Sequence, residues 1–198
     1  MTFGGKPTER GESRATVEYV LLGLLAIQPS GEIHGYDLGR ALSDGVIGQI
    51  VRVEPGMLYH YLKRLSRDGL LSTRVEAQVG RPDRQLHSLT AEGWNSLSTW
   101  LAAPVRSTRE IRLEFLIKLY LSRQLDPSQA RRLVFEQLNV MSARSQRLEA
   151  QIQATYPSTP DYVFGETILQ LREGQTRAAL EWLNSLPEAS DSSESGNE

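Results

Sequence analysis

The chain has 198 residues, of which 39% are hydrophobic and 23% are charged, a globular composition with material for one sizeable core or two small ones. It contains no cysteine, which excludes disulfide frameworks, thiolate nucleophiles and cysteine-bound metals, and fits a reducing cytoplasm. Its net charge of −2 argues against a protein that coats nucleic acid without regard to sequence.

Both ends of the chain are expected to be disordered. Residues 1–12 are rich in glycine and charge, and the residues from Pro187 onward are acidic and rich in serine. Between the ends, one helical pattern stops and another begins near Pro104. We therefore predict a disordered N-terminal arm over 1–12, an N-terminal domain over 13–103, a C-terminal domain over 104–187 and a disordered acidic tail over 188–198.

The N-terminal domain is predicted to begin with three helices. The first, over residues 16–28, contains the longest apolar run, VLLGLLAI, which is far shorter than the roughly 20 residues that cross a bilayer. Acidic residues precede this run, so no secretory signal is expected, and the protein should be cytoplasmic. A short helix over 34–43 follows a PSGE turn. The third helix starts at Pro55, which suits a first helical turn, and stops at Gly69.

A hairpin and a fourth helix complete the N-terminal domain. The segments LLSTRVEAQ and RQLHSL have the pattern of two strands, and the turn VGRPDR between them gives the hairpin a basic tip. Thr90 is placed to cap the helix AEGWNSLSTWLAA. Three helices, a hairpin and a fourth helix within about 85 residues have the order of a winged helix-turn-helix domain.

The third helix, in LYHYLKRLSRDGLL, has two chemically different faces. Leu58, Leu62 and Leu65 cluster on one side, with Tyr61 at its border, and form the core face. The opposite side carries Tyr59, His60, Lys63, Arg64 and Arg67. A solvated basic face would explain such a helix on its own. The basic hairpin that follows favours a helix that enters the major groove of DNA instead, and residues 52–84 carry a local charge of +3.

The basic and aromatic residues of the third helix and the hairpin divide into two groups by chemistry. Tyr59, His60 and Arg64 are the candidates for contacts with base edges, because their side chains can donate or accept hydrogen bonds in the groove. The candidates for phosphate contacts are Lys63, Arg67, Arg74, Arg81 and Arg84, of which Arg81 and Arg84 lie near the hairpin tip.

The C-terminal domain is predicted to be all helical. The helix over residues 110–123 is apolar on nearly every side and must be buried on several of them. Asp126 and Pro127 open a long helix to about Thr155, and a last helix covers about 161–186. Both long helices have apolar seams, which could pair within one chain, but the apolar helix beside them favours a homodimer. The candidates for dimerisation are Phe115, Leu119, Val134, Leu138, Met141, Leu148, Ile168, Leu171 and Trp182.

The sequence resembles the PadR family of bacterial transcriptional regulators. The likeness rests on LLGLLAIQPSGEIHGYDLGRAL, EPGMLYHYLKRLSRDGLL and GRPDRQLHSLTAEG, and continues through RLEFLIKLYLSRQLDPSQARRL and ALEWLNSLPE into the C-terminal domain of longer PadR-like proteins. It implies a homodimer whose C-terminal helices embrace the partner, a pseudo-palindromic operator, and DNA contacts from Tyr59 and the wing. The chain departs from the family's usual residues at Met57, His60 and His87. These differences affect which bases the protein is expected to contact, but not the expected fold.

Other kinds of site find little support in the sequence. His34, His60 and His87 stand apart from one another, without cysteines or closely spaced carboxylates, so no metal site is expected. The sequence has no P-loop, nucleophile elbow or dinucleotide fingerprint, so we expect neither an enzyme nor a cofactor.

Tryptophans are the only hint of a ligand. Trp94 and Trp100, like Trp182, are more typical of a core, but aromatic rings at a cavity would suit a small aromatic effector.

The sequence therefore predicts a mainly α-helical protein with an N-terminal winged helix-turn-helix domain and a C-terminal helical dimerisation domain. Its expected function is that of a cytoplasmic transcription regulator, a homodimeric repressor that a small molecule releases from its operator. A transcriptional activator of the same fold is one alternative. Another is a winged-helix module that binds a protein instead of DNA, which would tolerate simultaneous replacement of Lys63, Arg64 and Arg67. A ligand-binding enzyme on the same dimer would need a turnover that these residues do not suggest.

Overall fold

The computed structural model describes residues 9–77, 84–154 and 160–190, and it divides into two compact units at the bond between Leu101 and Ala102. The fold is mainly α-helical with one small sheet, which confirms the predicted fold class. Among the described residues, no helix has the length and apolar character needed to cross a membrane.

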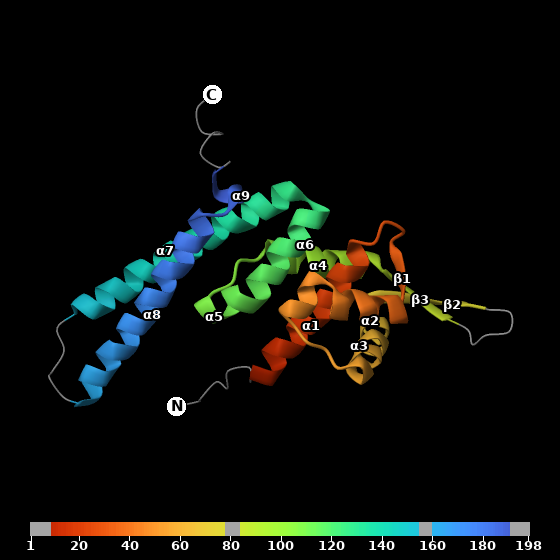
Figure 1. Ribbon diagram of the computed structural model, residues 1–198, viewed down its shortest axis with the longest axis horizontal. Helices are drawn as coiled ribbons and strands as arrows, with labels where there is room; N and C mark the ends of the chain where they lie inside the picture. Colours follow the sequence, from red (N-terminus) through yellow and green to blue (C-terminus); the bar gives the residue numbers. More distant parts are fainter. Residues whose placement is uncertain (1–8, 78–83, 155–159, 191–198) are drawn as a thin grey trace, which may run out of the picture. The chain divides into compact units, whose positions relative to one another are not determined.

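The N-terminal unit combines helices with a three-stranded sheet, and its β2–β3 hairpin projects away from the helices (Figure 1). Its elements are α1 (Glu9–Ala26), β1 (Glu32–His34), α2 (Gly35–Asp44), the 3-10 helix η1 (Val46–Gln49), α3 (Pro55–Arg67), β2 (Leu71–Glu76), β3 (Arg84–Leu89) and α4 (Ala91–Ala102). This order confirms the predicted winged helix-turn-helix arrangement.

Two predictions for this unit were wrong. Helix α1 begins at Glu9, inside the arm predicted to be disordered, whereas residues 1–8 of that arm lie outside the described residues. Residues 32–34 were predicted as the end of a turn and the start of a helix, but they form strand β1, which pairs antiparallel with β3 and places Ile33 opposite His87. A strand this short has too little alternation to be recognised without its distant partner.

The core face of α3 was predicted correctly. Leu58, Leu62 and Leu65 are buried, and so is Tyr61. Helix α2 packs so closely on α3 that a Cβ atom at Gly35 would lie only 3.2 Å from the Tyr59 ring. At its end α3 turns at Gly69, whose φ of 77° favours glycine, and the Leu70 amide donates to the Leu65 carbonyl.

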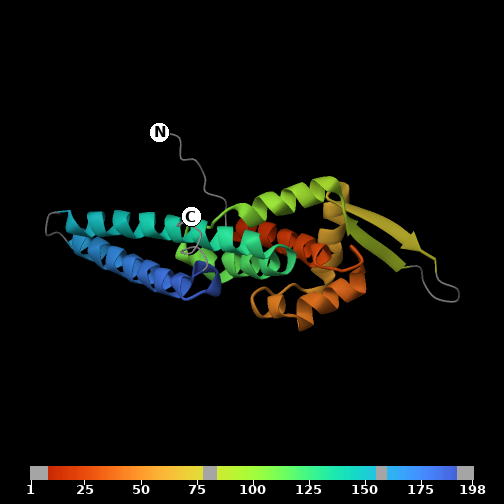
Figure 2. The ribbon, with the colours of Figure 1, turned by 90° about the horizontal axis from the view of Figure 1, so that it is seen from above.

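The C-terminal unit has helices and no strand in its described part. Its elements are α5 (Thr108–Glu110), the π-helix η2 (Ile111–Phe115), α6 (Leu116–Leu125), α7 (Pro127–Gln153), α8 (Pro160–Asn184) and α9 (Pro187–Ser190). Helices α7 and α8 lie side by side in one chain (Figure 2). Asp126 caps α7 by accepting a hydrogen bond from the Ser128 amide, as its sequence pattern predicts.

Helix α9 corrects the predicted start of the disordered tail. Residues 187–190 are helical, and Glu188 forms an ion pair with Arg123 of α6, where the Arg123 Nη2 lies 2.8 Å from the carboxylate. The hydrogen bond from Arg123 is the largest cause that lowers the pKa of Glu188 below its usual value. The acidic, serine-rich composition of the segment gave no sign of the contact between Glu188 and Arg123. The rest of the predicted tail, residues 191–198, lies outside the described part of the chain.

Candidate nucleic-acid interface

The solvent-facing side of α3 carries the side chains predicted to meet DNA. Tyr59 is 56% exposed, and His60 and Lys63 are also exposed. The His60 ring meets the Tyr61 ring edge to face, at a centroid distance of 6.2 Å. Lys63 makes no hydrogen bond or ion pair with another described residue, so its ammonium group is available to a phosphate.

Arg64 is less available than its position on α3 suggests. Its Nη1 lies 2.9 Å from the Glu18 Oε1 of α1, and its Nε lies 3.4 Å from the Asp68 Oδ2. The Arg64 side chain is only 30% exposed. The sequence segment around Tyr59 lacks acidic residues, but the fold brings Glu18 to it from a distant position. A role in base readout would require Arg64 to leave this pair.

Arg67 is exposed and holds a neighbouring carboxylate. Its Nε lies 3.1 Å from the Asp68 Oδ1. The hydrogen bond from Arg67 is the largest cause that lowers the pKa of Asp68, and Arg64 adds to it. Because both partners face solvent, this pair leaves Arg67 free to exchange Asp68 for a phosphate at small cost.

The hairpin contributes further basic groups. On β2, the Arg74 Nη2 lies 3.0 Å from the Glu32 Oε2 of β1, a pairing that the missed strand creates. Arg84 is exposed at the start of β3. The predicted contact Arg81 lies outside the described residues.

A groove next to α3 contains residues that sequence reasoning missed. It has a volume of about 570 Å³, and α2, η1, the segment before α3 and the start of α3 line it. Besides the predicted Tyr59, its lining includes Arg40, Arg52 and Tyr36. Tyr36 is 70% exposed. Tyr36 lies at the start of α2 and off the apolar side of that helix, and this is the signal in the sequence that could have pointed to the groove. The apolar pattern of α2 by itself indicates only that the helix packs on the core.

A chain of hydrogen bonds joins the end of α3 to the sheet. The Ser66 hydroxyl lies 2.8 Å from the Thr73 hydroxyl of β2, which lies 3.0 Å from the Nδ1 of His87 on β3. His87 is buried, and burial is the main cause that lowers its pKa, with the charge of His34 as the second cause. The family departure at His87 is therefore part of a polar link between α3 and the wing.

The lowered pKa of His87 predicts a loss of stability in mild acid. The unfolded imidazole binds a proton near its ordinary pKa of 6.5, whereas the folded imidazole binds it only at lower pH. The unfolded state therefore holds more protons in this window, so the free energy of unfolding falls as the pH drops below 6.5. Urea unfolding from about pH 7.5 to about pH 5 should show this fall, and His87→Phe should reduce it. His60→Gln, which removes an exposed histidine, serves as the control; equal slopes in both variants would contradict the prediction.

The two tryptophans predicted as ligand contacts have different surroundings. Trp94 on α4 is 42% exposed. Trp100 stacks on Tyr19 of α1 at a centroid distance of 4.7 Å, with the rings nearly parallel. Trp100 is therefore a packing residue in this structure, and any contact of either tryptophan with a ligand stays a prediction.

The residues predicted for dimerisation fall into three groups. Phe115, Leu119, Val134, Met141 and Leu148 are buried within the chain. Leu138 and Trp182 are partly buried against the same core, where Trp182 meets Phe115 edge to face. Only Ile168 and Leu171 on α8 are exposed. The apolar seams of α7 and α8 thus pack these two helices against each other within one chain. A role in dimerisation stays a prediction for all nine residues.

Comparison with known proteins gives consistent matches along the chain. Residues 21–99 match the family model described as the transcriptional regulator PadR-like family, and residues 111–189 match that described as virulence activator alpha C-term. A curated relative, the negative transcriptional regulator PadR of Bacillus subtilis strain 168, is 25% identical over 177 residues, with 86% of this chain and 94% of that protein covered.

Solved structures of the same Bacillus subtilis protein are also similar to this chain. Its complex with operator DNA is 25% identical, covers 85% of this chain and 95% of that one, and has a TM-score of 0.43. Its complex with p-coumaric acid is 24% identical, with coverages of 86% and 95% and a TM-score of 0.39.

Within the described residues, no group of three or more histidine, aspartate or glutamate side chains could hold a metal ion.

Proposed function

Because the chain belongs to the PadR-like family of transcriptional regulators, we propose that it represses transcription as a homodimer bound to a pseudo-palindromic operator. The observation that carries the proposal is the exposed face of α3, where Tyr59 and Lys63 stand opposite three buried leucines in a winged-helix unit. A helix with a buried apolar side and an exposed donor-rich side is what insertion into the major groove requires. The sign of regulation follows from the curated relative, which is a negative regulator.

Within this proposal the residues of α3 have different tasks. Tyr59 and His60 contact base edges, and Arg64 joins them only if DNA replaces Glu18 as its partner. Lys63 and Arg67 bind phosphates, together with Arg74, Arg81 and Arg84 of the hairpin. Tyr36 and Arg52, which line the groove beside α3, are added to the backbone contacts.

The proposed dimer uses the apolar residues that α8 leaves exposed. Phe164, Ile168 and Leu171 are exposed although apolar, and they fall within about 60° of one another around the helix axis. Exposed apolar patches of this kind mark interaction surfaces. Two copies joined in this way would carry two DNA-reading helices, as a two-fold symmetric operator demands.

An effector and a cellular location complete the proposal. A small molecule of unassigned identity would release the repressor by changing the separation of the two α3 helices, and Trp94 is its candidate contact because it is an exposed aromatic. We place the regulator in the cytoplasm, where bacterial DNA lies.

The proposal is tested by selection from a random duplex library with purified full-length protein at about 0.15 M salt, a concentration at which nonspecific binding is weak. Enrichment of an inverted repeat with half-sites about one helical turn apart supports the dimeric regulator and defines its operator. Enrichment of no sequence would favour a winged-helix module that binds a protein. A reporter gene placed behind the selected operator then decides between repression and activation.

A further inference from the structure

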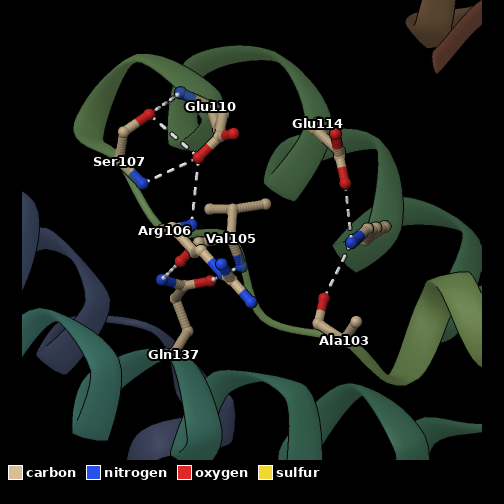
Figure 3. Close-up of polar contacts among 8 residues, drawn as sticks. Ala103, Val105, Arg106, Ser107, Glu110, Glu114 and Gln137 are labelled. Atoms are coloured by element: carbon tan, nitrogen blue, oxygen red, sulfur yellow. Dashed lines mark hydrogen bonds and ion pairs between the residues drawn. The ribbon is translucent and has the colours of Figure 1, made fainter. Parts of the chain in front are cut away.

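The segment that leads into the C-terminal unit is held unusually firmly. We call residues 103–107 the strap. None of its residues lies in a helix or a strand. Instead, the backbone of Ala103, Val105, Arg106 and Ser107 bonds to side chains of the C-terminal unit (Figure 3). Three side chains provide these bonds, and each comes from a different helical segment.

Gln137 of α7 binds the centre of the strap. The Val105 amide donates to the Gln137 Oε1 at 2.8 Å, and the Gln137 Nε2 donates to the Val105 carbonyl at 2.9 Å. Gln137 has no exposed surface, and Val105 is also buried. The amide side chain thus does for Val105 what a neighbouring strand does in a sheet, and no apolar side chain could replace it.

Lys118 of α6 binds the start of the strap. Its Nζ donates to the Ala103 carbonyl at 2.7 Å and lies 2.7 Å from the Glu114 Oε1 of the π-helix η2. The Lys118 side chain is only 2% exposed. A buried charge is costly, and a well-packed apolar residue often gives greater stability, so Lys118 has a poor rationale as a stabilising residue alone.

Glu110 binds the end of the strap. Its Oε2 accepts hydrogen bonds from the Arg106 amide and from the amide and hydroxyl of Ser107, and the Ser107 hydroxyl accepts one from the Glu110 amide. This is a capping box, which begins the helical segment that also carries Glu114. The π-helix η2 follows directly, and π turns inside helices occur often at functional sites.

We propose that Lys118 and Gln137 are positioning residues for operator recognition. By holding the strap to the C-terminal unit at Ala103 and Val105, they shorten the free length of chain between that unit and the winged-helix unit. In a dimer, a shorter free connection narrows the range of half-site separations that the two DNA-reading helices can reach together. The inference rests on the proposed function, since it needs a dimer that reads two half-sites.

The test compares wild-type protein with Gln137→Leu on the selected operator, on a single half-site and on operators whose spacer grows one base pair at a time to about half a helical turn. Gln137→Leu should bind the single half-site within about twofold of wild type, because the winged-helix unit is untouched. The advantage of two half-sites over one, which linked modules raise by about 10²- to 10⁴-fold, should fall by about tenfold. The wild type should discriminate steeply among spacers, and the variant should not.

Two further variants separate positioning from simple stability. Lys118→Met removes the bond to Ala103 and should act like Gln137→Leu; it replaces that variant if the leucine prevents folding. Thr176→Val is the matched control, because Thr176 is equally buried in the same unit but its hydroxyl bonds the Arg172 carbonyl of its own helix instead of the strap. Faster hydrogen exchange at the Val105 amide checks that the strap has been released.

The outcomes distinguish this inference from the proposed function. If wild-type protein shows no preference for two half-sites, the proposed function is wrong, and the inference that rests on it is wrong as well. If wild type prefers two half-sites and both strap variants keep its spacer dependence, only the inference is overturned. It is also overturned if the strap variants lose half-site and full-site binding in parallel, since the residues would then only stabilise the fold.

Discussion

Replacing Leu171 with glutamate is expected to convert the proposed dimer into a monomer. Leu171 is 62% exposed on α8 beside Phe164 and Ile168, so the change leaves the core of one chain intact. In the dimer it would place a charge from each chain in an apolar contact, which is strongly unfavourable. Sedimentation or light scattering should report the mass of one chain, and affinity for the two-site operator should fall by about 10²- to 10⁴-fold.

Gln170→Glu provides the control for this experiment. Gln170 is exposed, lies next to Leu171 in the sequence and points away from the apolar side of α8. Its replacement by glutamate therefore adds the same charge to α8 outside the apolar patch. A dimeric Leu171→Glu variant would remove α8 from the interface. Substitution of Met141, another predicted dimer residue, would be uninformative, because Met141 is fully buried in its own chain and its replacement would test folding instead.

Replacing Tyr59 and Lys63 one at a time should separate base readout from phosphate binding. Tyr59→Ala should weaken binding to the selected operator by about 1–3 kcal/mol for each half-site and should affect unrelated duplexes much less, because a base contact is lost. Lys63→Gln should weaken binding to all duplexes alike and should reduce the salt slope by about one for each protomer. Titrations of both variants on specific and unrelated DNA over a range of salt measure these differences.

Arg147→Gln is the matched control for the charge lost in Lys63→Gln. Arg147 is exposed on α7 and donates to the Ala143 carbonyl within its own helix, far along the chain from the winged-helix unit, so its removal should leave DNA binding unchanged. Equal losses on every duplex for Tyr59→Ala would assign Tyr59 to the backbone instead of to a base. Unchanged binding in both α3 variants would favour the protein-binding alternative.

Features with local causes could be predicted from the sequence. The two faces of α3 follow from helical periodicity, and its ends follow from Pro55 and Gly69, so local spacing is enough to place its bounds and its buried leucines. The α7 cap at Asp126 is predictable for the same reason. These features depend only on residues a few positions apart.

Features that depend on distant residues could not be predicted in the same way. Glu18 reaches Arg64 across the fold, and β1 exists only because β3 lies beside it. The heptad-like seams of α7 and α8 specify that apolar faces must be covered, but not whether the same chain or a second one covers them. Gln137 and Lys118 are polar residues, which local pattern reading assigns to the surface, whereas the structure buries both.

The pair between Arg64 and Glu18 has a consequence for changing the operator preference of this regulator. Transplanting α3 from a relative, as in recognition-helix swaps, would replace Arg64 but leave Glu18 on α1, mostly buried and facing whatever side chain arrived. Loss of the Arg64 ion pair from this mostly buried carboxylate destabilises the unit whatever DNA the new helix prefers. The smallest exchangeable piece is therefore not one helix but α3 together with position 18, and libraries of altered specificity should vary the two together.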